Sequence, residues 1–215
     1  MNFLCSWSGG KDSCYAFYKA VQSGYQPTVL LNVMNEYGDR SRSHGIPKEI
    51  LEAQATAIGV PIHFFNSTWT DYEVNYIKHL KDLVKRYDLS HAVFGDIDIA
   101  SHRAWEEKVS AAASVEAVLP LWQGDRKELV LAMIEDGVEA MIVSCNQTVG
   151  SDFLGRMIDK SLLEELEAMG VDACGENGEY HTLVVNTPFF KNRLDIEMTG
   201  KATSSNYNFA ELQLK

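Results

Sequence analysis

Hydrophobic residues along this chain follow two spacings in alternation, which predict alternating strands and helices. Continuous apolar runs with the length of buried strands occupy 3–7, 28–34, 61–65, 91–95, 117–121 and 139–145. Apolar residues recur every three or four positions over 12–23, 47–58, 72–87, 105–113, 126–136 and 161–169, as on one face of a helix. Asp125 followed by Glu128 predicts a capped helix start. This order predicts an α/β fold in which a parallel sheet carries helices on both faces.

The pattern changes from Thr182 onward. Residues 183–185, the alternating stretch 194–198 and residues 209–214 have strand patterns with no helical segment between them. Gly150, Ser151 and Gly155 cluster at the junction. We therefore expect one domain over residues 1–150 and a small β-rich lobe over residues 151–215.

A polar, glycine-rich segment joins the first predicted strand to the first predicted helix. It reads Ser8-Gly9-Gly10-Lys11-Asp12-Ser13. Ligands of an open parallel sheet bind beyond the carboxyl ends of its strands, and a helix N-terminus there favours phosphate. Glycines allow an anion to approach the backbone, and the serines and the lysine add hydroxyl donors and positive charge. The segment therefore predicts a phosphate-binding loop, although it matches neither the Walker A motif nor the dinucleotide fingerprint.

Composition and charge disfavour several classes of binding partner. The 215 residues are 46% hydrophobic and carry a formal net charge of −11, which disfavours nucleic acid as a partner. No apolar run approaches the roughly 20 residues that span a bilayer, and no secretory signal opens the chain, so we expect no membrane contact. Four cysteines without a C-x-x-C pair are typical of buried thiols in a reducing compartment, which predicts a cytoplasmic protein.

The loop resembles the PP-loop, S-G-G-x-D-S, of the ATP pyrophosphatases, which share a Rossmann-like fold with the adenine nucleotide alpha-hydrolases. The resemblance implies that ATP binds with its pyrophosphate end in the loop, so that attack falls on the α-phosphorus. It also implies Mg²⁺ between phosphate oxygens, with Asp12 as the candidate ligand. The expected nucleotide-binding residues are Ser8, Gly9, Gly10, Lys11, Asp12, Ser13 and Gly95, with adenine near Val33 and Met34.

A second segment indicates a particular family within the PP-loop proteins. It reads Gly175-Glu176-Asn177-Gly178-Glu179-Tyr180-His181-Thr182. Together with residues 94–97, 102–103, 105–106 and 120–122, it makes nearly the whole chain similar to the diphthine–ammonia ligase family. That resemblance implies a carbon–nitrogen ligase that adenylates a carboxylate, releases pyrophosphate, and amidates the adduct with ammonium to release AMP. The substrate is diphthine on elongation factor two in eukaryotic and archaeal members, and it is open for bacterial relatives.

Positions along the predicted fold and the same resemblance together indicate site residues and partners, with a polar turn or a solvated helix start as the alternative for several of them. The candidate catalytic residues are Lys11, Asp12, Asp96, Glu176, Glu179 and His181. The candidate substrate-binding residues are His44, His102, Arg103, Gly175, Glu176, Gly178, Glu179 and Thr182. Residues 1–150 would bind ATP, residues 151–215 would recognise the substrate, and a homodimer is expected.

Two other functions fit the loop. A sulfur-transferring PP-loop enzyme would use Cys145 or Cys174 as a thiol nucleophile, so a serine at either position would abolish its activity. A nucleotide sensor would bind ATP tightly without releasing pyrophosphate.

Overall fold

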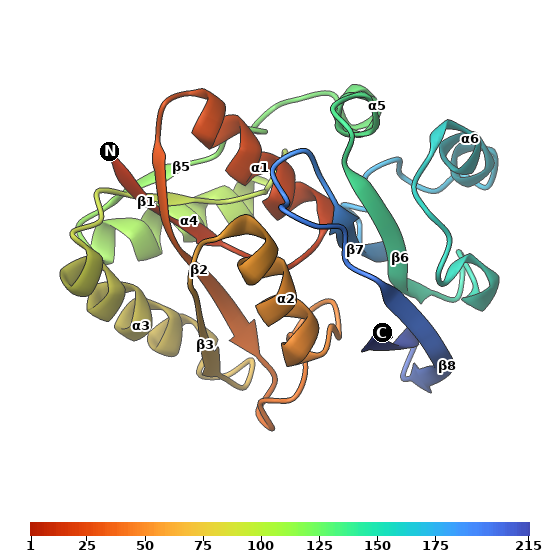
Figure 1. Cartoon of the computed structure of the whole chain (residues 1–215), viewed down its shortest axis with the longest axis horizontal. Helices are drawn as coiled ribbons and strands as arrows, with labels where there is room; N and C mark the ends of the chain where they lie inside the picture. Colours follow the sequence, from red (N-terminus) through yellow and green to blue (C-terminus); the bar gives the residue numbers. More distant parts are fainter. The chain divides into compact units, whose positions relative to one another are not determined.

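The computed structural model describes all 215 residues, which form two compact units (Figure 1). The first unit consists of Met1–Ser8, Asp12–Arg42 and Gly59–Gln123, and the second of Gly9–Lys11, Ser43–Ile58 and Gly124–Lys215. Each unit contains one β-sheet. No helix is long and apolar enough to cross a membrane.

The sheet of the first unit has five strands, all parallel, in the order β3-β2-β1-β4-β5. The strands are β1 (Asn2–Ser6), β2 (Gln26–Met34), β3 (Ile62–Asn66), β4 (His91–Val93) and β5 (Glu116–Val118). The helices of this part are α1 (Lys11–Gln22), α3 (Tyr72–Tyr87) and α4 (Ala100–Ala112). The predicted parallel α/β fold is confirmed.

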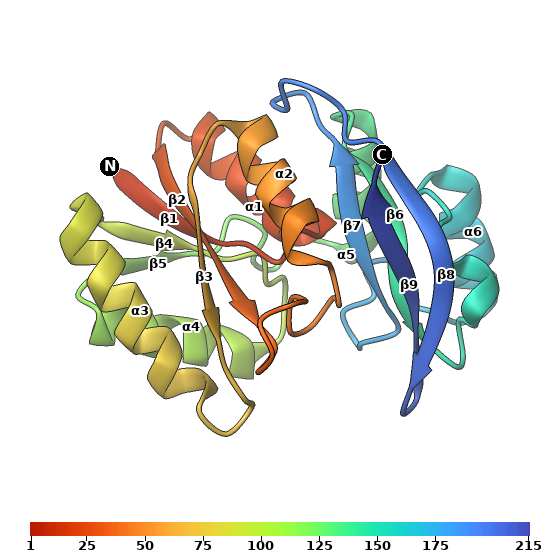
Figure 2. The same ribbon diagram turned by 60° about the horizontal axis from the view of Figure 1, so that its bottom comes forward.

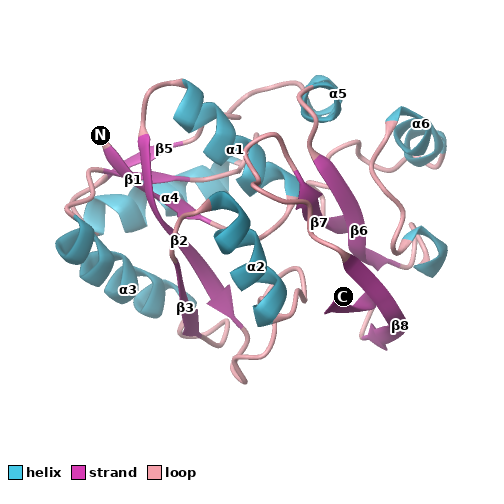
Figure 3. Ribbon diagram, in the orientation of Figure 1, coloured by secondary structure: helices cyan, strands magenta, loops and turns pink.

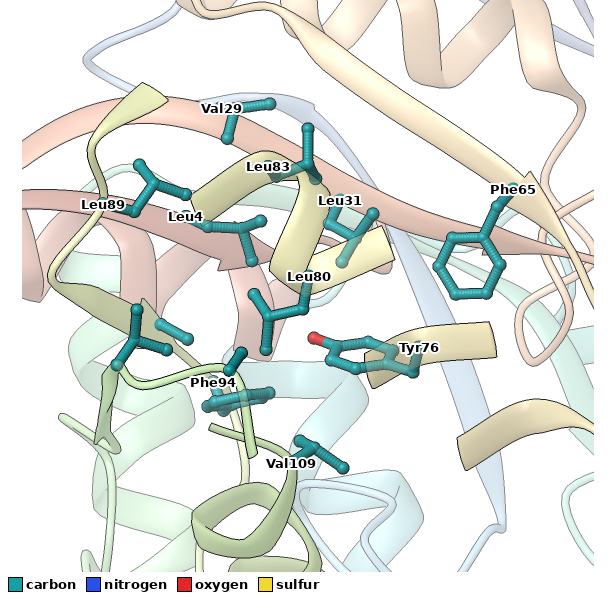
Figure 4. Packing of buried hydrophobic residues seen from close by; sticks show 13 residues of the cluster. Leu4, Val29, Leu31, Phe65, Tyr76, Leu80, Leu83, Leu89, Phe94 and Val109 are labelled. Atoms are coloured by element: carbon teal, nitrogen blue, oxygen red, sulfur yellow. The ribbon is translucent and has the colours of Figure 1, made fainter. Parts of the chain in front are cut away.

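Helices cover both faces of this sheet because neighbouring strand residues point to opposite faces. On one face, the Phe3 ring of β1 lies 5.6 Å from the Phe17 ring of α1. On the other face, Leu4 belongs to a buried cluster with Tyr76 of α3 and Val109 of α4 (Figure 4). Figure 2 shows α1 on one side of the sheet, and α3 and α4 on the other.

Helix α4 begins at Ala100, five residues earlier than the apolar pattern predicts. The residue before it, Ile99, makes no side-chain cap, so the sequence carries no start signal there. His102 and Arg103 therefore lie inside the first turn of α4 rather than before the helix. By contrast, Asp125 does cap α5 (Arg126–Glu135), because its Oδ1 accepts a hydrogen bond of 3.0 Å from Glu128 N.

The second unit contains an antiparallel sheet in the order β7-β6-β9-β8 (Figure 2). Figure 3 draws its strands in magenta. Its strands are β6 (Glu139–Asn146), β7 (Tyr180–Asn186), β8 (Ile196–Ser204) and β9 (Tyr207–Leu214). Its helices include α2 (Lys48–Ile58), α5, the short 3₁₀ helix η1 (Ser151–Phe153) and α6 (Lys160–Ala168), and α6 lies on the side of the sheet away from α2 (Figure 2).

The expectation that 139–145 continues the parallel sheet is wrong. Strand β6 pairs antiparallel with β7 and β9, and six of its eight residues are buried because it lies inside the second sheet. A continuous apolar run shows that a strand is buried on both faces but does not identify its neighbours. Residues 124–150 accordingly belong to the second unit, although the sequence pattern places them before the expected boundary at 150.

Candidate active site

In the first unit, the ends of the Ser8–Ser13 loop present hydroxyl groups at the carboxyl end of β1. Ser13 Oγ accepts a hydrogen bond of 3.2 Å from Ser8 N and lies 3.0 Å from Ser8 Oγ. The chain just before the loop is fixed by Asn32, whose Nδ2 donates to Trp7 O at 2.7 Å. With Asp12 in the first turn of α1, this is the arrangement of strand, polar turn and helix N-terminus that the loop sequence predicts.

Gly95, after β4, lies against the start of α1. A Cβ at this position would lie 2.7 Å from both Asp12 C and Ser13 N, closer than a carbon atom can pack. Only glycine fits here without moving main-chain atoms. The close approach also places the next residue, Asp96, at the same edge of the sheet as the loop.

Asp96 forms a polar chain with α4. Its Oδ1 lies 2.7 Å from His102 Nδ1, and its carboxylate also shares a hydrogen bond with Glu106, which is 2% exposed. Burial opposes ionisation of Asp96, but the hydrogen bonds from His102 and Glu106 outweigh it, and the pKa of Asp96 is lowered. The neighbouring Arg103 turns away, because its Nε donates to Glu107 Oε1 at 2.7 Å.

Val33 and Met34, the expected neighbours of adenine, end β2. Val33 packs partly buried against the cluster of Figure 4, and Met34 is fully buried. The carbonyl of Met34 accepts a hydrogen bond of 3.2 Å from Ser67 N. Adenine binding at this strand end stays a prediction.

In the second unit, the middle of the loop joins β7 and α2. Gly9 O accepts hydrogen bonds from Val184 N at 2.9 Å and from Gln54 Nε2 at 3.0 Å, while Gln54 Nε2 also donates to Val184 O at 2.7 Å. A Cβ on Gly10 would lie 2.5 Å from His44 Cε1. Gly10, which the sequence analysis explains by the approach of an anion, is therefore also closely packed inside this unit.

Lys11 is buried rather than presented to solvent. Its exposed fraction is 3%, its Nζ donates to Cys174 O at 2.5 Å, and it lies 5.4 Å from the centre of the Tyr180 ring. Its main-chain N–H donates to Thr182 Oγ1 at 3.0 Å. In this structure the ammonium therefore holds the chain just before the Gly175–Thr182 segment, whereas the sequence analysis assigns it to phosphate.

The turn of the Gly175–Thr182 segment is stabilised by its own side chains. Glu179 accepts hydrogen bonds from Asn177 N at 3.1 Å and from Asp172 N at 3.4 Å. Glu176 N donates to Asp172 Oδ2 at 2.7 Å, and Tyr207 Oη donates to Gly178 O at 2.6 Å. The carboxylate of Glu179 thus shapes the turn, a role that the sequence analysis does not assign to it.

His181 stands beside His44, with ring centres 4.7 Å apart. His44 Nδ1 lies 2.8 Å from Thr182 O. Burial, together with the neighbouring His44 and the Lys11 charge, lowers the pKa of His181 to about 3. The imidazole is therefore neutral at physiological pH and is a weak proton acceptor.

The predicted site residues thus gather in two groups, one in each unit. The first group, in the first unit, comprises Ser8, Asp12, Ser13, Gly95, Asp96 and His102. The second group, in the second unit, comprises Gly9, Gly10, Lys11, His44, Gly175, Glu176, Gly178, Glu179, His181 and Thr182. The Ser8–Ser13 segment contributes to both groups: its two ends belong to the first group, and Gly9–Lys11 belong to the second.

No group of three or more histidine, cysteine or acidic side chains forms a ready-made metal site. Mg²⁺ commonly binds through one or two carboxylates and completes its shell with phosphate oxygens and water. Asp12, a single carboxylate in the first turn of a helix that follows a polar loop, fits that mode of binding. The donor set is therefore suited to a magnesium–triphosphate and unsuited to a metal held by protein alone.

Three positioning residues escape the sequence motifs: Asn32, Gln54 and Glu106. Each is a polar residue at a buried position, with 3%, 0% and 2% of its surface exposed. A polar residue within an apolar strand or helix stripe is the signal that indicates such a role, because a buried polar group needs a hydrogen-bond partner.

The cysteines do not favour sulfur transfer. All four are buried and none forms a disulfide. Burial raises the pKa of the Cys145 thiol, and Cys174 Sγ donates to Arg126 O at 3.0 Å. A thiol whose pKa is raised is a poor nucleophile at neutral pH, which weighs against the sulfur-transfer alternative.

A parallel sheet whose first strand leads through Ser8–Ser13 into a helix N-terminus defines an ATP-binding α/β protein of the PP-loop class. Family comparison is more specific. The diphthamide synthase N-terminal domain matches residues 1–117, and the diphthamide synthase C-terminal domain matches residues 125–213. The chain belongs to the diphthamide synthase family.

Individual relatives agree with this assignment. The diphthine–ammonia ligase of Bos taurus is 27% identical over 229 residues, covering 94% of this chain and 85% of the bovine chain. That of Homo sapiens is 26% identical over 216 residues, covering 88% of this chain and 80% of the human chain. A solved structure from Methanocaldococcus jannaschii, described as a predicted subunit of tRNA methyltransferase, is 15% identical with a TM-score of 0.48, covering 87% of this chain and 98% of its own. A likeness of that extent identifies no function.

Proposed function

We propose that this protein is an ATP-dependent amide ligase that adenylates a carboxylate, releases pyrophosphate, and then forms the amide with ammonia and releases AMP. The observation that carries the proposal is the S-G-G-K-D-S loop at the N-terminus of α1, in a chain matched over nearly its full length by the two diphthamide synthase domains. The names of the relatives, diphthine–ammonia ligase, support a carbon–nitrogen ligase with diphthine as the carboxylate substrate. The family resemblance places that diphthine on elongation factor two.

The chemistry needs positioning and charge neutralisation rather than a protein nucleophile. Ser8, Ser13 and the main-chain amides at the start of α1 would bind phosphate oxygens. Asp12 would hold Mg²⁺, which neutralises charge on the departing pyrophosphate when it is bound. Lys11 would add positive charge, for which its ammonium must exchange the Cys174 carbonyl for a phosphate oxygen.

Two other groups would bind ammonium and the carboxylate substrate. Asp96 and His102 would bind ammonium and accept its proton. Residues 175–182 would recognise the acceptor carboxylate and the chain that carries it, with the turn held in shape by the contacts of Glu179.

The remaining expectations belong to the same proposal. Adenine would lie beside Val33 and Met34, and Mg²⁺ would be the metal. We also propose that the protein acts as a homodimer in the cytoplasm, with ATP bound by the N-terminal part and the substrate recognised by the C-terminal part.

The test is amidation itself. The protein is incubated with ATP, MgCl₂, ammonium and elongation factor two that carries diphthine, and the modified peptide is analysed by mass spectrometry. We expect an amide whose mass depends on whether ¹⁴N or ¹⁵N ammonium is supplied, formed with one AMP per amide. AMP formation with a different carboxylate only would refute diphthine as the substrate and leave the chemistry standing.

A pair of variants distinguishes an effect on the site from an effect on folding. Asp12→Asn removes the candidate metal ligand and should abolish amide formation without changing the unfolding temperature. Asp125→Asn is the control, because asparagine also caps helices and Asp125 caps α5. Turnover by Asp12→Asn at the wild-type rate would refute the role of Asp12.

A further inference from the structure

Helix α4 carries a glutamate that is almost wholly inside the protein. Glu106 is 2% exposed. Glutamate is seldom buried unless it is paired or protonated, because an ionised carboxylate loses its hydration. Whether the Glu106 carboxyl group is ionised or protonated therefore depends on its neighbours.

The partner of Glu106 is another carboxyl group. His102 and Glu106 are four residues apart on α4, so both project from the same side of the helix. Asp96, in the segment between β4 and α4, contacts both of them: its Oδ1 lies 2.7 Å from His102 Nδ1, and its carboxyl group is hydrogen-bonded to Glu106. The three side chains form one chain in the order His102, Asp96, Glu106.

A hydrogen bond between two carboxyl groups requires one proton, because ionised carboxylates only accept. Asp96 has the histidine on its other side, and its side chain is 31% exposed, so it is the better placed of the two to be ionised. Glu106 is the more deeply buried, and burial favours the neutral acid. The proton therefore belongs on Glu106.

The titratable side chains that α3 places near Glu106 agree with a neutral acid. Helix α3 contributes Tyr72, which is partly buried, and Tyr76, which is fully buried. Burial and the Asp96 charge raise the pKa of Tyr72 to about 12 against the opposing charge of Arg42, and burial raises the pKa of Tyr76, so both tyrosines are neutral at physiological pH and offer Glu106 no positive charge.

We infer that Glu106 is protonated at neutral pH and is a positioning residue, which donates a hydrogen bond to Asp96 and thereby fixes the Asp96–His102 pair. The fixed carboxylate holds the imidazole as the tautomer with its proton on Nδ1, which leaves the lone pair on the other ring nitrogen.

This inference deepens the proposed function and rests on it for the chemistry. An amide ligase that uses ammonium must remove a proton before the nitrogen can attack. One N–H bond of ammonium breaks, the proton passes to the lone pair of the His102 imidazole, and neutral ammonia remains. The Asp96 carboxylate stabilises the imidazolium that forms. After the C–N bond forms, the nitrogen loses its second proton to solvent and AMP leaves with the electron pair of the broken C–O bond.

The first experiment needs no turnover. Infrared spectra of the full-length protein at neutral pH should show the absorption of a protonated carboxyl group, which disappears in Glu106→Gln. Glu107→Gln is the matched control, because Glu107 is the next residue on α4 and is exposed and paired with Arg103. Absence of the band from the wild-type spectrum, or its persistence in Glu106→Gln, would overturn the inference.

A second experiment follows the pair itself. The pKa and tautomer of His102, measured by NMR titration, should be unchanged in Glu106→Gln, since the amide keeps a neutral donor in the same place. A fall in the pKa of His102 in that variant would mean that a negative charge has been removed, and hence that Glu106 is ionised. This result is independent of whether the protein forms amides.

The role in catalysis is tested by a third comparison. Glu106→Leu fills the site without a donor and should lower kcat by about 10- to 100-fold, by analogy with the loss when the hydrogen-bond partner of a metal-bound histidine is removed. Glu106→Gln should restore kcat to near the wild-type value, with the pH profile unchanged. Equal loss in both variants, with wild-type unfolding temperatures, would refute the positioning role.

Discussion

Replacing Gly95 with alanine tests the closest packing between β4 and the start of α1. The added Cβ would lie 2.7 Å from Asp12 C and Ser13 N. Non-bonded carbon atoms pack at roughly 3.5–4.0 Å, so the shortfall is about 1 Å. Because both atoms belong to the main chain, no side-chain rotation relieves the clash. Overpacking of this kind typically costs about 1–3 kcal/mol.

The expected loss is visible in thermal unfolding. For a protein of this size each kcal/mol lowers the unfolding temperature by roughly 2–4 °C, so Gly95→Ala should lower it by about 2–12 °C. The displaced start of α1 should also reduce ATP-dependent AMP formation more than the unfolding temperature alone explains.

Gly200→Ala is the matched control. A Cβ there would lie 2.6 Å from Glu211 Oε2, which is the end of a flexible side chain and can rotate away. We expect little change in its unfolding temperature, measured by circular dichroism, or in its AMP formation. Indistinguishable unfolding temperatures and activities for the two variants would refute the reasoning from the close approach.

Three further predictions follow from buried polar groups. Gln54→Leu removes two hydrogen bonds to buried carbonyls and should lower the free energy of unfolding in urea by about 1–3 kcal/mol. The surface variant Gln213→Leu should not, and equal urea midpoints for the two variants would contradict this prediction. Lys11→Met removes the donor to the Cys174 carbonyl, so hydrogen exchange over residues 174–178 should accelerate, and unchanged exchange would contradict the anchoring role. Burial, chiefly, lowers the pKa values of His63 and His79 below the ordinary 6.5. The unfolded chain then binds more protons below that pH, so the free energy of unfolding should fall from pH 7 to pH 5 and fall less in His79→Phe; an equal slope in both proteins would refute the assignment.

Local signals account for what the sequence could predict. Helix α3 runs over Tyr72–Tyr87, as its apolar spacing predicts, because an amphipathic stripe is written into consecutive residues. The Ser8–Ser13 segment follows β1 and runs into the first turn of α1, which begins at Lys11, because strand, turn and helix start are adjacent in the chain. Asp125 caps its helix for the same reason.

Features that depend on contacts between distant parts of the chain could not be predicted from the sequence. The neighbours of β6 come from β7 and β9, and nothing in the apolar run 139–145 specifies them. Lys11 and Cys174 are 163 residues apart, so their hydrogen bond is invisible to any local pattern. The start of α4 carries no capping side chain, and this hid the helical placement of His102 beside Asp96.

The central claim is that ATP is broken between its α- and β-phosphorus atoms, and ³¹P NMR of a complete reaction tests it most directly. With ATP, MgCl₂, ammonium and elongation factor two carrying diphthine, the account predicts AMP and pyrophosphate in equal amounts. Accumulation of ADP and inorganic phosphate, with amide formed, would contradict it.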